Sequence, residues 1–457
     1  MTDLQHEQRH QMMTTEPVNR LITKLAIPTI LAMLVTSIYN MADTYFVSQL
    51  GTSASGAVGI VFPIMTMIQA IGFMLGNGGG NTLSRYLGAK KNHEAEQVAS
   101  TAFFTSIFLG LILMIIGQLF LNKLMVLIGA TDTILPYAHQ YGFYILLGAP
   151  YMAASFTLNN LLRSQGNSIS SMIGIMVGGI INIILDPIFI YTFGFETAGA
   201  AIATIISQFI SFLILLYFIN SKNSIVKIKF KNFTLQWKIF REIFSVGLPS
   251  FYRQGLASIA MILLNAQAGI YGDAAISAMT IVTRIYQFIF SSCLGLGQGF
   301  QPVCGYNYGA KRYDRVKQGF WFFVKVVIVV FSIISLLAIF NASSIMAIFR
   351  RNDPEVIAIG TKALIFYCLS IPLLSWTVAC NITSQAIGKS IYASIISLSQ
   401  QGLFFIPAIL LLPRYIGITA IQVSIPLANL LTFLISIPIG IKLLQELNTS
   451  SKKETNI

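Results

Sequence analysis

Long apolar runs follow one another through the whole chain, separated by short segments rich in charged residues, Gly or other turn formers. A run of about 20 apolar residues is long enough to cross a membrane as a helix. We therefore predict an all-α integral membrane protein with twelve spans, at residues 21–49, 57–84, 97–121, 136–163, 168–192, 197–219, 241–270, 275–305, 317–345, 355–386, 390–412 and 417–443.

Residues 24–90 are repeated at 245–311 with a constant offset of 221 positions. The matches run without a gap through helix, loop and helix, and they include Pro28 with Pro249, Gly51 with Gly272, Ala57 with Ala278, Leu75 with Leu296, Gly76 with Gly297, Gly78 with Gly299, and Gly88-Ala89-Lys90 with Gly309-Ala310-Lys311. Gly166 and Gly388 continue the repeat at an offset of 222. We infer two duplicated six-helix halves, an organisation that suggests a transporter.

Composition supports a membrane protein, because 55% of the residues are hydrophobic, only 10% are charged and the mean hydropathy is +0.73. Soluble domains have roughly 25% charged residues. The net charge of +13 has the placement of a topology signal rather than of a nucleic-acid surface. Of 29 Lys and Arg, 21 fall on one predicted side, and the other side has only Lys123, Arg350, Arg351, Lys362 and Arg414. The positive-inside bias predicts that both termini and the 220–240 loop are cytoplasmic.

Signatures of catalysis, metal binding and secretion are missing from the sequence. The polar first eighteen residues contain no apolar segment of a removable signal peptide. The Cys residues lie in apolar spans without paired spacing and the His residues are scattered, at Cys293, Cys304, Cys368, Cys380, His6, His10, His93 and His139. No phosphate-binding, nucleophile or ATPase motif occurs. We therefore expect no enzyme activity, no structural metal and no cofactor.

Small residues and prolines inside the spans predict close packing and bending. We expect the Gly residues at 76, 78–80, 295, 297 and 299 to let helices approach each other. Candidate kinks are Pro28, Pro63, Pro150, Pro187, Pro249, Pro302, Pro372 and Pro407.

Two carboxylates lie deep in apolar spans, where an ionised group costs about 2.5 to 3.5 kcal/mol and usually faces a cavity. Asp43 and Asp186 each lie about twenty residues into a span that begins in the cytoplasm, so both should lie in the outer half of the bilayer. Tyr39 and Asn182 precede them by four residues and should share their helix faces. Pro187 removes a backbone donor beside Asp186. We predict a shared polar site.

Such a site has two interpretations. It could be an interhelical hydrogen-bond network that only holds helices together, although neutral side chains would do this at lower cost. Alternatively, because burial disfavours the charged form of a carboxylate, the acids could load and unload a proton. The same oxygens could ligate sodium, so the coupling ion stays open between H⁺ and Na⁺.

The second half has no equivalent acid, because Leu264 occupies the position that corresponds to Asp43. Ion coupling should therefore belong to the first half. The deep charges of the second half are basic: Arg253 and Arg284 are candidates for lining a substrate cavity, with a structural role equally open, and Lys325 should reach the cytoplasmic interface.

These features together resemble the multidrug and toxic compound extrusion (MATE) antiporters, and in particular a prokaryotic branch with an aspartate pair in the first lobe. The resemblance covers essentially the whole chain. It rests on the two six-helix halves, on Pro28, Asp43, the Gly88-Ala89-Lys90 loop and its copy, Arg163 with Gly166, the stretch 182–187 and the stretch 199–204. The loop at 88–94 lacks the acidic, arginine-rich pattern of the major facilitator superfamily.

The resemblance implies a V of two pseudo-symmetric helical bundles around a central cavity that opens alternately to each side. Carried over residue by residue, it implies ion coupling by Asp43, Asp186, Asn182, Asn159, Thr204, Tyr39 and Tyr141. It also implies a monomer in a bacterial inner membrane that exports amphipathic or cationic drugs in exchange for H⁺ or Na⁺. We expect a cytoplasmic tail at 1–20, an N-lobe at 21–220, a linker at 221–240, a C-lobe at 241–443 and a tail at 444–457.

Two rival functions stay open. A flippase for a lipid-linked precursor would use several cavity cations to bind phosphate, such as Arg253 and Arg284, whereas the twelve spans and the acid pair oppose it; an exporter of a narrow set of metabolites is the related alternative. A membrane-embedded scaffold or enzyme is the other rival, but the sequence has no catalytic cluster.

Overall fold

Long helices occupy all twelve predicted spans in the computed structural model, which describes residues 2–222, 224–349 and 353–455. Arg350 and Arg351, counted above among the charges of the minority side, lie outside the described residues. The N-lobe comprises α2 (Val18–Ser48), α3 (Thr52–Gly88), α4 (Asn92–Leu119), α5 (Leu121–Ile128), α6 (Leu135–Ser164), α7 (Ser168–Pro187), the π-turn η1 (Ile188–Thr192) and α8 (Glu196–Asn220).

The C-lobe repeats this order after a linker that contains the 3₁₀ turn η2 (Phe230–Asn232). It comprises α9 (Trp237–Gly269), α10 (Asp273–Gly309), α11 (Tyr313–Phe340), α12 (Ala342–Phe349), α13 (Pro354–Ser370), η3 (Ile371–Leu373), α14 (Leu374–Ala386), α15 (Ser390–Leu398), the π-turn η4 (Ser399–Phe405), α16 (Ile406–Leu411), α17 (Pro413–Ile416) and α18 (Thr419–Thr455). No strand occurs in the described ranges.

Eleven helical segments of the described chain are long and apolar enough to cross a membrane. The remaining predicted span is α9, which has 33 residues and therefore sufficient length. Its middle carries Tyr252, Arg253 and Gln254, so it is less apolar than the others. The polar middle of α9 indicates that this helix faces protein or water over part of its length rather than lipid alone.

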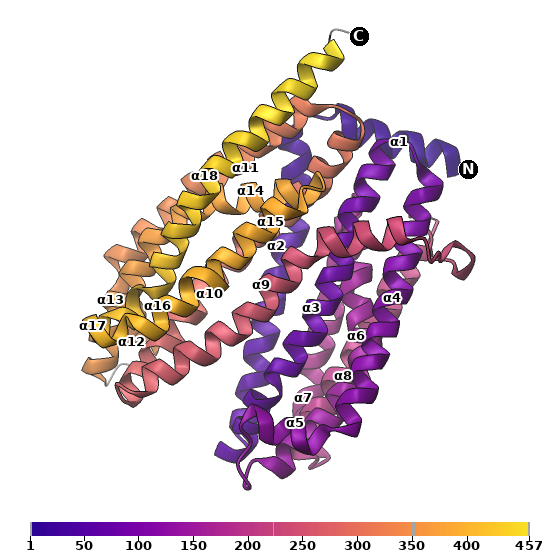
Figure 1. Ribbon diagram of the computed structural model, residues 1–457. Helices are drawn as coiled ribbons and strands as arrows, with labels where there is room; N and C mark the ends of the chain where they lie inside the picture. Colours follow the sequence, from indigo (N-terminus) through magenta and orange to yellow (C-terminus); the bar gives the residue numbers. More distant parts are fainter. Residues whose placement is uncertain (1, 223, 350–352, 456–457) are drawn as a thin grey trace.

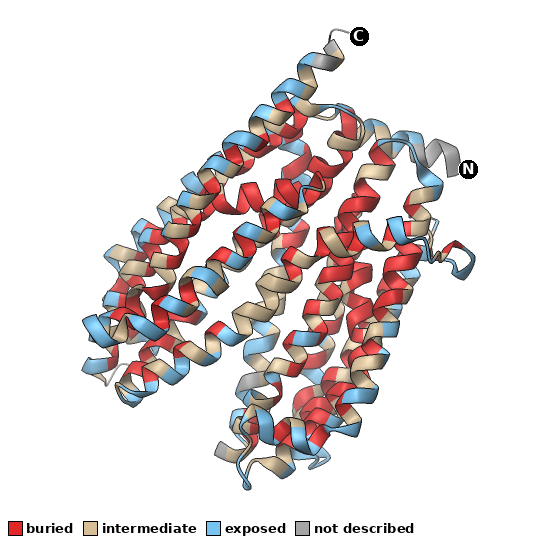
Figure 2. Ribbon diagram, in the orientation of Figure 1, coloured by how far each residue is buried: buried red, intermediate tan, exposed pale blue. Residues whose placement is uncertain are grey.

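The two bundles form a V in Figure 1, close together at the end that carries both termini and diverging toward the other end. Figure 2 shows the buried residues inside each bundle and where the bundles cross. The crossing pairs α2 with α10 and α3 with both α9 and α10. The predicted V of two helical bundles is confirmed.

Glycines make the crossing possible. A Cβ atom on Gly78 of α3 would overlap the carbonyl oxygen of Ile243, and one on Gly247 of α9 would overlap that of Met74. A Cβ atom on Gly295 or Gly299 of α10 would overlap the backbone of α2. The expected role of these glycines in close helix packing is confirmed, because any side chain would push the backbones apart.

The sequence repeat has the same backbone conformation in both halves. Lys90 and Lys311, 221 residues apart, are two of the non-Gly residues with a positive φ, at 58° and 61°. Each lies in a turn closed by the next residue, with Lys91 donating to Tyr86 O at 2.8 Å and Arg312 donating to Asn307 O at 2.8 Å. The short helices α5 and α12 show the same offset. This agreement supports duplication.

Three of the candidate kink prolines lie at breaks in regular helix. Pro187 ends α7 before η1, Pro372 lies within η3, and Pro407 follows η4. The others lie inside continuous helices, so each removes a backbone donor without ending the helix there.

Both predicted tails are more ordered than expected. The N-terminal segment forms the helix α1 (Thr2–Thr15), and α18 continues through the expected C-terminal tail to Thr455. The helices α5 and α12 also replace segments that we expected to be loops. Hydropathy detects only long apolar runs, and these segments are short or polar.

Candidate functional site

Two carboxylates approach each other inside the N-lobe, because α2 packs against α7. Asp43 lies on α2 and Asp186 on the last turn of α7, close enough for the two charges to repel. Asp186 is fully buried, and Asn182, one turn earlier, donates to its Oδ1 at 3.2 Å. Its Oδ2 atom and the Oδ1 atom of Asp43 are buried without a hydrogen-bond partner among the described residues.

Side chains from α2, α6 and α8 complete this acid site. The Asn182 amide also lies 3.4 Å from the hydroxyl of Thr204 on α8. Tyr141 of α6 is fully buried, its hydroxyl donates to the sulfur of Met65 at 3.9 Å, and it lies near Thr204 and both carboxylates. Tyr39 packs against Gly179 of α7 and faces the same two acids. Six of the seven predicted coupling residues therefore converge.

The break in helix α7 positions the acid site. Pro187 directly follows Asp186 and the chain then forms the π-turn η1. Single-turn π segments are rare and occur frequently at functional sites. The π-turn η1 packs against α8, the helix that carries Thr204.

Asn159 does not join the acid site. Its amide donates to the carbonyl oxygen of Ser171 at 3.0 Å and to the hydroxyl of the same residue at 2.6 Å. Ser171 is fifteen residues before Asp186 on α7, about 22 Å away along a helix with a 1.5 Å rise per residue. The expectation that Asn159 belongs to the ion site is therefore corrected. Asn381 makes the same contact with Ala393 O in the C-lobe, also at 3.0 Å, which indicates a structural role repeated in both lobes.

The two deep arginines of the C-lobe lie apart from the acids. Arg284 is exposed on α10, and Arg253 is half-buried on α9. Within the described part of the chain, neither forms a salt bridge with a carboxylate. The charged group that Arg253 approaches is instead Arg163 of the N-lobe. Neither arginine belongs to the acid site, and a role in lining the substrate cavity stays a prediction for both.

A series of hydrogen-bonded polar side chains connects the two lobes where they cross. It was not predicted from the sequence, because the search for site residues started from charges at mid-membrane depth. Arg163 is 1% exposed, and its guanidinium donates to Gln298 of the C-lobe at 2.7 Å and to Asn160 of its own helix. Asn77 accepts from the same group at 3.4 Å and donates to Ser250 of the C-lobe at 3.0 Å. These bonds connect the lobes through neutral amides rather than carboxylates.

A neutral network in the C-lobe was also missed, because it contains no charge. Asn429 of α18 donates to Tyr286 at 3.1 Å and to Ser370 at 3.0 Å, and it accepts from Gln400 at 2.9 Å. The signal for it in the sequence is the presence of amides inside apolar spans. The two lobes therefore differ chemically: among the described residues, the N-lobe site has carboxylates and the C-lobe network has none.

The acid site has the chemistry of a reversible cation or proton site. Carboxylate oxygens that are buried without a donor are costly, and a proton or a hard cation would satisfy them. Two such acids cannot both stay ionised at low cost, since like charges in a medium of low dielectric repel strongly. Occupancy of this site therefore changes the charge inside the N-lobe.

Comparison with known proteins identifies a family whose members resemble this chain in both halves. The sequence profile of the MatE family matches residues 28–188 and 249–410, once in each half. The multidrug export protein MepA of Staphylococcus haemolyticus is 29% identical over 405 residues, which cover 88% of this chain and 89% of MepA.

Solved transporters have the same fold. An outward-facing multidrug resistance MATE transporter of the MOP superfamily is 26% identical, with a TM-score of 0.90 over 96% of this chain and 98% of that one. A MOP superfamily transporter from Pyrococcus furiosus, described by a binding pocket of reverse polarity and a different function, is 26% identical with a TM-score of 0.89 over 96% and 98%. The duplicated profile match, the shared V and the matching length together show that this multi-pass membrane protein belongs to the MatE family.

Proposed function

We propose that the protein is a secondary multidrug efflux transporter that exports amphipathic, cationic small molecules in exchange for H⁺ or Na⁺. Relatives named as multidrug exporters match along nearly the full length, which supports drug export rather than enzyme activity. The arrangement of the lobes supports alternating access, in which the V closes at one end while it opens at the other.

The coupling site in this proposal is the acid site, with Asp43 and Asp186 as the groups that take up and release the ion. Asn182, Thr204, Tyr39 and Tyr141 orient these groups, and Asn159 has no direct part. Ion and drug must favour opposite conformations, because only differential binding shifts a conformational equilibrium. One ion that enters down 100 mV supplies about 2.3 kcal/mol, enough for a roughly fiftyfold gradient of a neutral substrate at tenfold per 1.4 kcal/mol. Exchange of one such ion for one monovalent cationic drug moves no net charge and forfeits this electrical contribution, so the stoichiometry decides the gradient.

The observation that carries this proposal is the pair of buried carboxylate oxygens in the acid site that have no hydrogen-bond partner among the described residues. The test uses inside-out vesicles, in which export appears as uptake of a cationic dye into the vesicle. Proton and sodium gradients are imposed separately. Asp43→Asn and Asp186→Asn should each lose most gradient-driven export. The matched control is Asp132→Asn, because Asp132 is exposed in the loop before α6. Wild-type export rates in both buried variants, at normal amounts in the membrane, would show that the coupling assignment is wrong.

We further propose that the protein is a monomer in the bacterial inner membrane with both termini in the cytoplasm, and that the lobes and linker have the boundaries expected above. The excess of Lys and Arg on the side of the termini supports this orientation. A single cysteine added at either terminus should react with an impermeant reagent in inside-out vesicles and not in intact cells.

An anionic substrate is the second candidate, as for a lipid-linked precursor or a narrow set of metabolites. It is favoured by Arg163 and Arg253, two cations that approach each other without a carboxylate between them in the described chain. Competition between the dye and a set of organic anions decides the question. Export that anions inhibit and cationic drugs do not would favour this candidate.

A further inference from the structure

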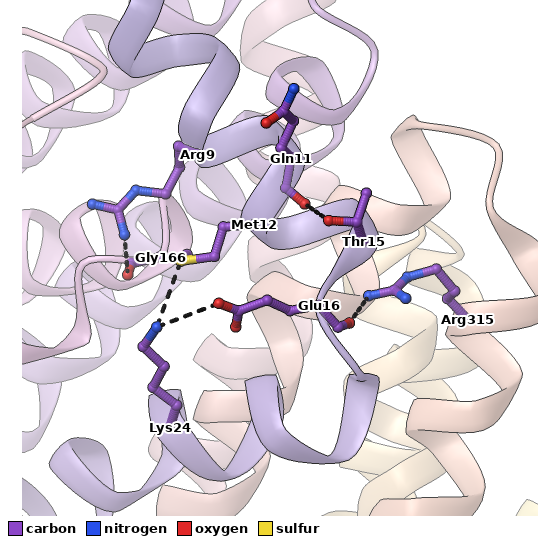
Figure 3. Close-up of polar contacts among 8 residues, drawn as sticks. All are labelled: Arg9, Gln11, Met12, Thr15, Glu16, Lys24, Gly166 and Arg315. Atoms are coloured by element: carbon purple, nitrogen blue, oxygen red, sulfur yellow. Dashed lines mark hydrogen bonds and ion pairs between the residues drawn. The ribbon is translucent and has the colours of Figure 1, made fainter.

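The N-terminal helix α1 lies across the end of the molecule where the lobes meet (Figures 1 and 3). It precedes the first span and is joined to it through Glu16 and Pro17, so the chain itself ties α1 to the N-lobe. Its side chains contact both lobes. The helix is therefore a bridge between two bodies that must move relative to each other during transport.

Three side chains of α1 contact the N-lobe. The Arg9 guanidinium donates to the carbonyl oxygen of Gly166, in the turn between α6 and α7, at 3.3 Å (Figure 3). Met13 is fully buried and packs on the same glycine. Gly166 has a positive φ of 83°, a backbone conformation that would be strained with any other residue. Glu7 pairs with Lys90 at 3.3 Å across the surface.

Contacts with the C-lobe are as numerous. The His10 ring lies 5.6 Å from the ring of Tyr306 on α10. Asn307 donates to the carbonyl oxygen of Met13 at 3.0 Å. Arg315 of α11 donates to the carbonyl oxygen of Glu16 at 2.6 Å, as Figure 3 shows, and its Nε atom donates to Asn307 at 2.8 Å. These donors hold the last turn of α1 against the C-lobe.

The helix α1 lies beside one of the close contacts of the crossing. Tyr306, which packs on His10, is the residue whose carbonyl oxygen touches Gly88 of the N-lobe. Separation of the lobes at this end would pull Tyr306, Asn307 and Arg315 away from an α1 that is tied to α2. The contacts with α1 must therefore break when this end opens.

The composition of α1 suits a contact that breaks reversibly. Only Met13 among its described apolar side chains is fully buried, and most of its other contacts are hydrogen bonds and exposed ion pairs. Exposed pairs contribute little and exchange readily with water. A larger apolar face would hold the lobes together permanently.

We propose that α1 is a lock on the cytoplasmic side: it stabilises the state in which the lobes are closed at this end, and it releases the C-lobe when that end opens. The inference rests on the proposed transport function and on the proposed cytoplasmic orientation of this end. It does not depend on which ion drives transport, so its failure and the failure of the coupling assignment are separate results.

Cys304 reports on closure at this end. It is 1% exposed on α10, two residues before Tyr306, with Arg85 of the N-lobe nearby. A variant that keeps only this cysteine is treated with an impermeant maleimide in inside-out vesicles. Met13→Asn, which changes α1 alone, should speed alkylation about tenfold.

A second variant tests the lock from the other lobe. Arg315→Gln removes the contact with α1 and should also speed alkylation of Cys304. The matched control is Arg312→Gln, because Arg312 directly precedes α11, is exposed, and forms an ion pair only with Asp314 among the described contacts. Unchanged alkylation in Met13→Asn and Arg315→Gln would overturn the proposal.

A cross-link tests whether α1 must release. His10→Cys with Tyr306→Cys, in a background without other cysteines, joins α1 to the C-lobe upon oxidation. Transport should stop in the oxidised protein and return with reductant, and each single variant should be insensitive to oxidant. Full transport by the cross-linked protein would contradict the lock.

Discussion

Gly88 and Gly309, 221 residues apart, each lie against the helix that carries the other. A Cβ atom on Gly88 would overlap the carbonyl oxygen of Tyr306, and one on Gly309 would overlap that of Arg85. Tyr306 and Arg85 are themselves 221 residues apart, so the two contacts are related by the internal repeat. The lobes are therefore in close contact through a symmetric pair of glycines at the end that closes.

Enlarging either glycine should weaken closure at this end. Overpacking costs about 1 to 3 kcal/mol, so Gly88→Ala and Gly309→Ala should each expose Cys304 to the maleimide. Gly59→Ala is the matched control, because this residue lies on the same helix as Gly88 and its added methyl group would meet nothing within 4 Å. Equal alkylation of Gly88→Ala and Gly59→Ala would mean that the close contact does not limit closure.

The buried Arg163 should couple energetically to Gln298 across the lobes. Hydrogen bonds to charged groups contribute about 1.5 to 3 kcal/mol, so Arg163→Gln should lower the melting temperature and open the closed end. The double-mutant cycle with Gln298→Ala should give a coupling energy of about 0.5 to 3 kcal/mol. Additive effects of the two substitutions would argue against this bond as a link between lobes.

Acid should loosen the lock through His10. Burial first, and the nearby positive charge of Lys90 second, lower the pKa of His10 below its ordinary 6.5, while Glu7 acts in the opposite direction. Its ring also faces Tyr306. Docked α1 therefore favours the neutral ring, so docking is strongest above pH 6.5 and weakens as the pH falls through 6.5 toward the lowered value.

The measurement is alkylation of Cys304 at cytoplasmic pH 7.5 and 5.5. His10→Gln cannot titrate, and its alkylation at each pH corrects for the reactivity of the thiol itself. The ratio of the wild-type alkylation rate to the rate of His10→Gln should be higher at pH 5.5 than at pH 7.5. A constant ratio between the two proteins would exclude His10 as the sensor.

Loss of the Asn182 amide should impair ion coupling more than drug binding. Removing one partner of a buried polar group costs about 1 to 3 kcal/mol, so Asn182→Ala should reduce gradient-driven efflux about tenfold while dye affinity stays within twofold. Asn341→Ala is the control, since Asn341 directly follows α11 and its exposed amide donates only to Leu337 O of that helix among the described contacts. A parallel loss of dye affinity would assign Asn182 to the drug site instead.

Several features of the acid site could be predicted from spacing along single helices. Asp186 with Asn182 and Asp43 with Tyr39 each share a helix face, because residues four apart are neighbours on a helix. Asn159 shows the limit of a resemblance in sequence: the motif contained the residue, but its side chain bonds to Ser171 near the other end of α7. Depth along a neighbouring helix depends on how helices cross, which no local pattern encodes.

By itself the sequence determined the helical class, the spans and the duplication, because a lipid environment requires long apolar helices and a repeated gene segment repeats its residues. The tertiary structure alone decided what meets across helices: the acids of α2 and α7, the glycine pair at the crossing, and the docking of α1. The reason is physical. Hydropathy acts on each segment separately, whereas these contacts depend on the rotation and crossing of helices far apart in the chain, which the packing of all side chains sets together.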